Sequence, residues 1–164
     1  MVDRQAIFEL QANGAGLFVT NSSMENLEIK IKGISWAGAE LDRAPFGLDR
    51  HGVEWYAKLL KNHGFNAVRL HFSHGAVLNN RNIEGATDAG DEHIDAEREL
   101  LGVTYMQMLR HIATRLQAHG LLVILSAAAL APKVSSNGLW YSEDVPLEMV
   151  KTSWERLALH LCAA

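Results

Sequence analysis

The stretch NAVRLHFSH, Asn66 to His74, indicates how this 164-residue chain folds. It is a short apolar run that carries one arginine and contains two histidines, and a helical pattern ending in glycine precedes it. The same order of helical pattern, His-Gly and apolar run returns as HGLLVIL, from His119 to Leu125. A repeat of helix, glycine stop and strand is typical of a chain that winds β-α-β-α. In such folds functional side chains gather where the strands end.

Apolar periodicity predicts the other elements. Gly64 and Gly120 supply left-handed stops after two of the helices. Loops are long after the strands and short before them, which favours parallel strands joined by right-handed crossovers. The expected elements are a hairpin around Asn13-Gly14, a strand over 27–38, a helix over 49–63, a strand over 66–72, a polar loop over 74–101, a helix over 104–118, a strand over 121–125 and a helix over 146–162.

Two α/β architectures fit this order: an open doubly wound sheet and part of an eight-stranded barrel. The first wants a glycine-rich phosphate turn after its first strand, and SWAGAELDRAPFG, Ser35 to Gly47, is not one. The predicted fold is therefore a partial (β/α)8 TIM barrel, its first three β/α units preceded by a short β-hairpin. We expect a β lead-in over 1–26 and the barrel portion over 27–164. The unbroken apolar run of the third strand predicts a sheet covered on both faces.

Composition narrows the class of protein. The chain is 48% hydrophobic and 21% charged, with a net charge of -4, which gives no electrostatic reason to expect a nucleic-acid or membrane partner. The single cysteine, Cys162, excludes a disulfide within the chain and a cysteine-based zinc cluster. The N-terminal MVDRQAIFEL lacks the apolar core of a signal peptide, and the sequence leaves localisation open.

Polar and aromatic residues follow the predicted strands. Arg69 stands inside an apolar strand, where an arginine is costly unless it is paired, so we expect it to meet a carboxylate. Trp36 and Trp140 could stack on sugar rings or pack in the core. The remaining candidates are Glu40 and Asp42 as acid and base or as solvated loop carboxylates, His71 and His74 as a metal pair with Asp91, Glu92 and His93 as helpers, and Ser126 at the third strand end.

Five segments in order resemble the N-terminal part of glycoside hydrolase family 5, the endoglucanase-like retaining glycosidases. They are IKIKGISWAG, GFNAVRLHFS, LLGVTYMQML, HGLLVIL and NGLWYSEDVPLEMVKTSWERLALHLC, and the resemblance covers about Leu27 to Leu161. It implies that Arg69 supports the nucleophilic carboxylate and that Trp36, His71 and Trp140 are substrate-binding residues. It implies a polysaccharide or oligosaccharide partner, no cofactor and no metal. The family is commonly secreted.

The resemblance also marks what this chain lacks. The family's third strand commonly ends in Asp-x-His, where this chain has Ser126 and Ala128. The acid/base glutamate ends the fourth strand and the nucleophilic glutamate ends the seventh, so both are expected beyond this chain. Retaining hydrolysis needs two carboxyl groups about 5 Å apart. We therefore assign no catalytic residue and predict that the chain alone is inactive.

Two alternatives remain. The same half barrel could be a non-catalytic carbohydrate- or protein-binding module, since its exposed sheet edges would allow self-association. A small α/β metal hydrolase using His71 and His74 would require stoichiometric metal.

Overall fold

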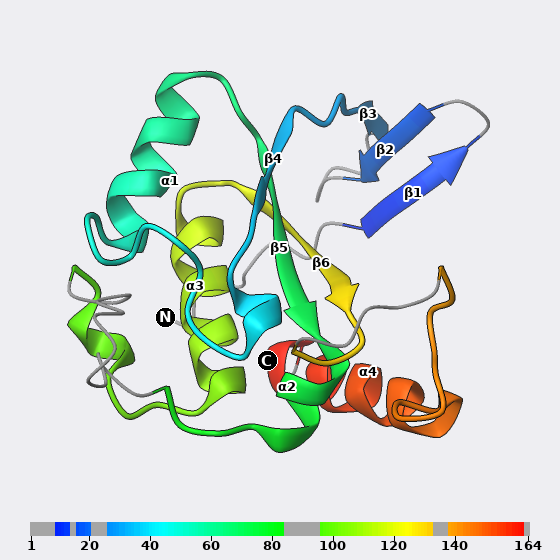
Figure 1. Cartoon of the computed structure of the whole chain (residues 1–164). Helices are drawn as coiled ribbons and strands as arrows, with labels where there is room; N and C mark the ends of the chain where they lie inside the picture. The colour runs from blue at the N-terminus through cyan, green and yellow to red at the C-terminus, as the bar shows by residue number, and fades with distance from the viewer. Residues whose placement is uncertain (1–8, 14–15, 21–25, 84–95, 133–137, 163–164) are drawn as a thin grey trace, which may run out of the picture. The chain divides into compact units, whose positions relative to one another are not determined.

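The computed structural model of the chain describes residues 9–13, 16–20, 26–83, 96–132 and 138–162. The chain divides into two compact units, Met1–Lys32 and Gly33–Ala164. Each unit has its own three-stranded sheet, labelled in Figure 1.

The first unit is a small antiparallel sheet. Its strands are β1 (Glu9–Asn13), β2 (Gly16–Thr20) and β3 (Asn26–Glu28), in the order β1-β2-β3. β1 and β2 pair antiparallel, whereas Gly14 of the expected turn lies outside the described residues. The prediction of one continuous strand over 27–38 is wrong, because β3 ends at Glu28 and a new strand begins at Gly33 in the other unit. The Ile29 amide still donates to the Leu17 carbonyl, 2.8 Å, whereas residues 30–32 are exposed and have no buried face that would extend the strand.

The second unit has the parallel sheet that the sequence predicts. Its strands are β4 (Gly33–Trp36), β5 (Ala67–Ser73) and β6 (Leu122–Ala129), in the order β4-β5-β6. Its helices are α1 (Val53–Asn62), α2 (His74–Asn79), α3 (Tyr105–Ala118) and α4 (Leu147–Cys162). Two short 3-10 helices, η1 (Ala39–Leu41) and η2 (Arg98–Leu100), lie in the connections.

The helix boundaries have local causes. Gly64 and Gly120 both have positive φ, 73° and 67°, which confirms the glycine stops after α1 and α3. Thr104 and Gln107 form a capping box at the start of α3. The helix expected over 49–63 is shorter than predicted, because residues 49–51 form turns and Gly52 is the N-cap of α1.

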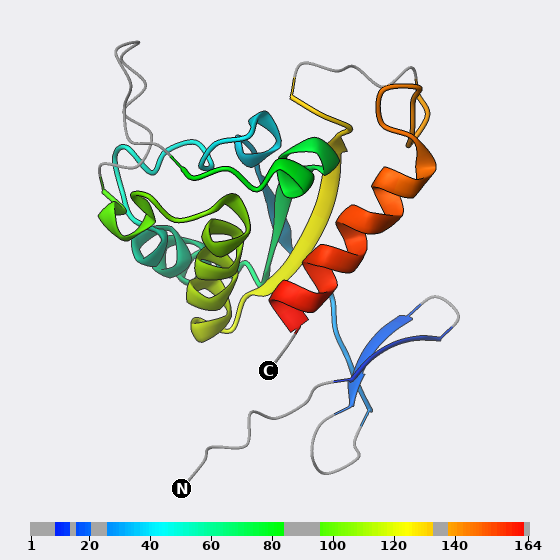
Figure 2. The same ribbon diagram turned by 90° about the horizontal axis from the view of Figure 1, so that it is seen from below.

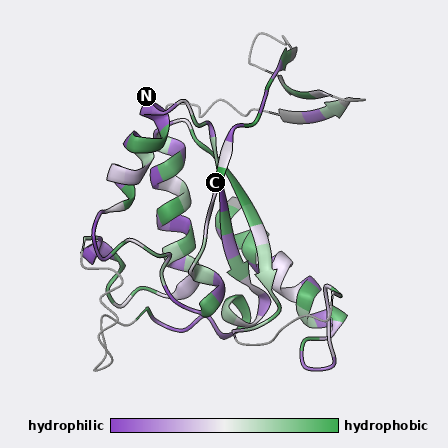
Figure 3. Ribbon diagram, turned by 45° about the horizontal axis from the view of Figure 1, so that its top comes forward, coloured by the Kyte–Doolittle hydropathy of each residue, from purple (hydrophilic) through white to green (hydrophobic). Residues whose placement is uncertain are grey.

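One face of the parallel sheet forms the core. Alternate residues of β5 (Val68, Leu70 and Phe72) are fully buried, and they belong to one apolar cluster with α1, α3 and Leu157 of α4. α1 and α3 lie side by side against the sheet in Figure 2, and Figure 3 shows hydrophobic residues along the strands and on the helix stripes. The prediction that β6 is covered on both faces is wrong within the described residues, because Ile124 is exposed.

α2 is the helix that the sequence pattern does not reveal. It occupies the start of the segment predicted as a polar loop over 74–101, of which residues 84–95 lie outside the described part. The side chain of Ser73 caps it by accepting a hydrogen bond from the Ala76 amide, 3.2 Å. Six residues are too few to show helical periodicity.

No helix in the described part of the chain combines the length and the apolar character that crossing a membrane requires.

Tyr105 joins the helix layer to the sheet and provides a test of the core. Its buried hydroxyl donates to the carbonyl of Ala39, 2.7 Å, and also hydrogen-bonds to the Ser73 backbone. Because Tyr105→Phe removes both contacts without changing the packing volume much, we expect it to lower the free energy of unfolding by about 1–3 kcal/mol in a denaturant titration. Tyr141→Phe, at an exposed tyrosine, is the matched control and should change it by less than about 0.5 kcal/mol. Equal effects from the two variants would contradict this placement of Tyr105.

Candidate functional site

The sheet register gathers polar side chains on the face that the helices leave free. Arg69 is paired with Ser35 on β4 and with Ile124 on β6, and His71 is paired with Ser126. Paired residues of parallel strands point to the same side of a sheet. These five residues form what we call the open sheet face; Ser35, Arg69 and Ile124 are exposed, and His71 and Ser126 are partly buried.

Glu40 brings a carboxylate to His71. Its Oε2 accepts a hydrogen bond from the Gly38 amide, 2.7 Å, and lies 3.9 Å from His71 Nδ1. The two side chains are only 17% and 18% exposed, so water screens the pair weakly. Gly38 permits this turn: its φ is 120°, and a Cβ there would lie 2.6 Å from the Phe46 nitrogen. Glu40 is therefore held by a backbone shape that only glycine adopts easily.

The other ring nitrogen of His71 is buried and has no hydrogen-bond partner among the described residues. Buried polar atoms are usually paired, because leaving one unpaired costs about 1–3 kcal/mol. A ligand at this face would meet the part of the His71 ring that is exposed, which is 18% of the side chain, and not the buried nitrogen.

Arg69 differs from its sequence-based expectation. Its side chain is exposed, and within the described residues it has no carboxylate partner. The prediction assumed a strand buried on both faces. On an open face the guanidinium stays hydrated, so no burial penalty has to be offset by an ion pair. Its five N–H donors remain available.

Trp36 does not share the open sheet face. It is paired with Leu70 in the register, so it points toward the helix-covered side. Its Nε1 donates to the carbonyl of Phe46, 2.8 Å, and its ring lies 5.1 Å from that of Tyr56. The structure therefore separates Trp36 from Arg69 and His71, a separation that register alone determines.

Trp140 lies in the segment that leads to α4. It is 60% exposed, and its ring meets Tyr141 edge to face at 5.4 Å. The ring is accessible to a ligand, as a sugar contact requires.

Asp42 is occupied by a structural ion pair. Its carboxylate accepts hydrogen bonds from Arg81 Nε, 2.9 Å, and from a second nitrogen of the same guanidinium. The Asp42 side chain is only 4% exposed, and its backbone is left-handed, with φ 63°. Of the two carboxylates proposed as acid and base, only Glu40 is directed toward the open sheet face.

His74 is a core residue, so the metal pair with His71 is not formed. His74 is buried, and its Nδ1 lies 2.5 Å from Ser153 Oγ. That hydroxyl donates to the Val150 carbonyl, 2.8 Å, so Nδ1–H is the donor to Ser153. Burial lowers the pKa of His74, which keeps the ring neutral at pH 7. The expected metal helpers Asp91, Glu92 and His93 lie outside the described residues.

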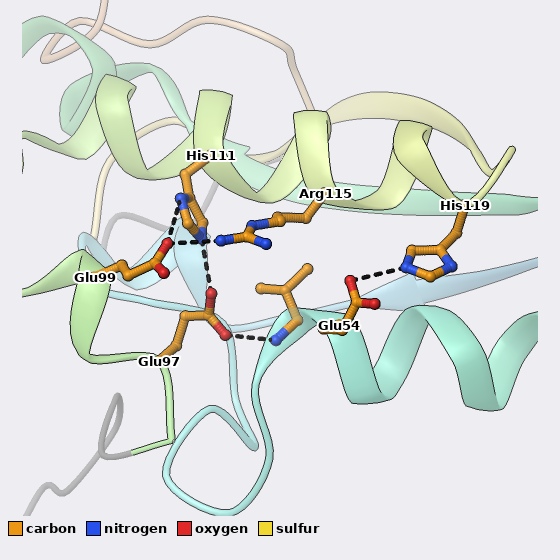
Figure 4. A network of polar contacts seen from close by, with 7 residues as sticks. Glu54, Glu97, Glu99, His111, Arg115 and His119 are labelled. Atoms are coloured by element: carbon orange, nitrogen blue, oxygen red, sulfur yellow. Dashed lines mark hydrogen bonds and ion pairs between the residues drawn. The ribbon is translucent and has the colours of Figure 1, made fainter.

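A second polar cluster joins α1, η2 and α3 (Figure 4). His111 Nε2 lies 2.7 Å from Glu97, whose other oxygen accepts from the Val53 amide, 2.7 Å; Glu99 pairs with Arg115 at 2.8 Å. Glu97, Glu99 and His111 could present ligand atoms to one metal ion. Each of the three side chains already has a protein partner, so the cluster is best explained as a structural connection between α1 and α3.

His119 and Glu54 extend this connection between α3 and α1, with 2.8 Å between Nε2 and Oε2. The hydrogen bond from His119 and the one from Lys58 hold the pKa of Glu54 below its usual value.

Solved structures share this fold. No family model matches the chain, and no curated protein sequence does. An endocellulase from Pyrococcus horikoshii, crystallised with cellotetraose, matches with a TM-score of 0.79 and 23% identity over 94% of this chain and 40% of that one. The catalytic domain of the major endoglucanase from Xanthomonas campestris pv. campestris matches with a TM-score of 0.66 and 23% identity over 81% of this chain and 37% of that one.

This chain thus spans about two-fifths of the length of these endocellulases. The likeness confirms the predicted fold at a coarse level, an α/β portion of a cellulase barrel.

The depressed pKa of His74 predicts acid sensitivity. Its folded value lies below the ordinary 6.5, so below that pH the unfolded chain takes up a proton that the folded chain does not. The His74 contribution to the free energy of unfolding should be complete well above pH 6.5 and decrease as the pH is lowered below that value. Chemical denaturation at several pH values measures it. His74→Asn, which can keep the donor to Ser153, should flatten the slope relative to the unsubstituted chain. An unchanged slope in His74→Asn would be the contrary result.

Proposed function

We propose that this chain is part of a retaining, endoglucanase-like glycoside hydrolase of family 5. The observation that carries the proposal is the match of 94% of the chain to an endocellulase fold. The five sequence segments that resemble the family support it, because three of them form the strands β4, β5 and β6 of the parallel sheet. The parental substrate would be a β-linked glucan or a similar polysaccharide, without a cofactor.

We further propose that this chain does not hydrolyse glycosides on its own. Retaining hydrolysis uses one carboxyl group as nucleophile and another as acid and base, about 5 Å apart. Among the described residues that we place at the open sheet face, Glu40 alone carries a carboxylate. Asp42 is tied to Arg81, and the strand-end positions Ser126 and Ala128 have no ionisable group. Both catalytic glutamates would come from later strands.

The proposed role of the open sheet face is to hold a sugar and to support the absent nucleophile. Arg69 would donate to a carboxylate from another strand, for which its planar fork of donors is well shaped. His71, oriented by Glu40, would contact the sugar through the exposed part of its ring. Trp140 would contact a sugar ring through its exposed face.

A second candidate function is a non-catalytic binding module. Among the described strands of this sheet, β4 and β6 are edges, each paired on one side only. Ile34 on β4 and Ile124 on β6 are exposed large apolar residues. Unpaired edges beside apolar side chains favour association, and a dimer could still bind oligosaccharide at its strand ends.

The test of inactivity uses soluble β-glucan. Purified chain, expressed in a host deleted for its own β-glucanases, should release no reducing ends above the level of a Glu40→Gln preparation. A turnover that Glu40→Gln abolishes would show that the chain has its own catalytic carboxylate and would overturn the proposal.

The test of sugar binding uses cellotetraose followed by NMR. Arg69→Ala and His71→Ala should each weaken binding about 3- to 10-fold, as expected for loss of a hydrogen bond made by a polar or charged group. Arg110→Ala, at an exposed arginine of α3, is the matched control and should leave binding unchanged.

Sedimentation of the same samples separates the two candidate functions: a stable dimer that binds the sugar supports the binding module.

A further inference from the structure

Four aromatic rings contact one another between the end of β4 and the first turn of α1. Trp36 lies 5.1 Å from Tyr56, Tyr56 lies 5.0 Å from Trp55, and Trp55 lies 3.8 Å from His51. The position of the Tyr56 ring is fixed by its hydroxyl, which donates a hydrogen bond to the carbonyl of Gly47, 2.9 Å. The inner rings, Trp36 and Tyr56, are partly buried against the core, whereas His51 and Trp55 are exposed.

The outer pair is a parallel stack. The rings of His51 and Trp55 are inclined by only 14°, and Tyr56 stands nearly perpendicular to both, at 75° and 88°. If Tyr56 lay on the far face of Trp55, the distance from Tyr56 to His51 would be the His51–Trp55 distance plus the Trp55–Tyr56 distance. The observed distance between the Tyr56 and His51 rings is much shorter, 6.1 Å. Tyr56 therefore lies at the edge of Trp55, and the far face of the indole is covered by neither aromatic neighbour.

The exposure of Trp55 agrees with this geometry. Trp55 is 44% exposed, although a large aromatic side chain gains stability from burial. Its flat indole packs against His51 on one face and Tyr56 at its edge, so a ligand that binds to the other face would cost little further side-chain entropy.

Charged groups flank the stack. Arg50 precedes His51, and its side chain is 81% exposed. Lys58, three residues after Trp55 and therefore on the same side of the helix, pairs with Glu54 at 3.0 Å. These side chains supply donors and acceptors around a flat apolar surface.

We propose that His51 and Trp55 form a second carbohydrate-binding site, the His51–Trp55 platform, which is separate from the open sheet face. A pyranose ring has one face of C–H groups that suits the negative face of an indole, and a rim of hydroxyls that suits the flanking charges. Two rings are far too small for a stable protein interface, which buries roughly 800 Å² per partner. The ligand class is a β-linked glucan chain.

The platform is independent of the open sheet face in structure. Trp36, its innermost neighbour, is directed to the helix-covered side of the sheet, opposite to Arg69 and His71. The proposal rests on the proposed glucan partner but requires no hydrolysis. Its role would be to hold a polysaccharide beside the strand ends. Because the two sites lie on different sides of the sheet, each can be tested separately.

The experiment is an NMR titration of 15N-labelled chain with cellotetraose, following the indole N–H signals of the four tryptophans. The Trp55 signal, assigned by its loss in Trp55→Phe, should shift in a saturable manner. It should shift equally in the Arg69→Ala/His71→Ala double variant. The Trp154 signal is the internal control: Trp154 is 41% exposed, similar to Trp55, but it packs on Phe72 and should not move.

Variants of the platform should give graded effects. His51→Ala removes the stacking partner and should raise the dissociation constant read from the remaining Trp55 signal about 3- to 10-fold, whereas His51→Phe keeps a flat partner and should restore most of the affinity. His51 and Trp55 are both exposed, so the fold should tolerate substitutions at either position.

Three results would overturn the platform. A Trp55 signal that stays fixed while Arg69 and His71 signals move leaves the proposed function standing and removes this inference. A Trp55 signal that moves with protein concentration in the absence of sugar assigns the surface to self-association. A titration in which no signal moves removes both proposals. Movement of Trp55 without movement of Arg69 and His71 would support the platform and contradict the proposed sugar site at the strand ends.

Discussion

The alternation of side chains along β5 is the constraint on which the rest of the structure depends. Val68, Leu70 and Phe72 are fully buried against the helices, so Arg69 and His71 must point to the other side. A shift of one residue would place the arginine in the core, at a cost of several kcal/mol. The polar character of the strand-end site is thus a direct consequence of where the core lies.

The strand ends are then fixed by contacts between distant segments. Tyr105 of α3 holds the carbonyl of Ala39 in η1, and the next residue along, Glu40, reaches His71. Asp42, at the end of η1, is held by Arg81. The carboxylate beside His71 is therefore positioned by packing on one side of it and by an ion pair on the other. The Glu40–His71 pair therefore has a defined geometry.

Much of the barrel portion could be predicted because its signals are local. Gly64, Gly120 and the apolar stripe of α3 report on neighbouring residues, and they match the structure. The apolar stripe of α1 matches except at Leu59, which is exposed. The failures involve contacts that no local pattern encodes. The sequence suggests His74 as a metal ligand, but in the structure its Nδ1 hydrogen-bonds to Ser153, 79 residues away. Trp36 lies in the expected strand over 27–38, yet its register with Leu70 turns it toward the helices.

Arg69 shows why the site was only partly predictable. Its sequence context is that of a buried strand, and a buried arginine requires a carboxylate. Whether one face of the strand is covered depends on the number of neighbouring layers, which the nine residues around it do not specify. The aromatic contact of Trp55 with His51 was missed for the simpler reason that a four-residue spacing also fits an ordinary exposed helix turn.

The central structural claim is that one face of the parallel sheet is open and bears Arg69 and His71. Its most direct test is thiol labelling in a Cys162→Ser background, with single cysteines replacing Arg69, Ile124 or Leu70. The account predicts that thiols at positions 69 and 124 react at nearly the rate of the unfolded chain, while the thiol at position 70 reacts at least about 100-fold more slowly, since it must wait for the sheet to open. Equal protection at all three positions would contradict it.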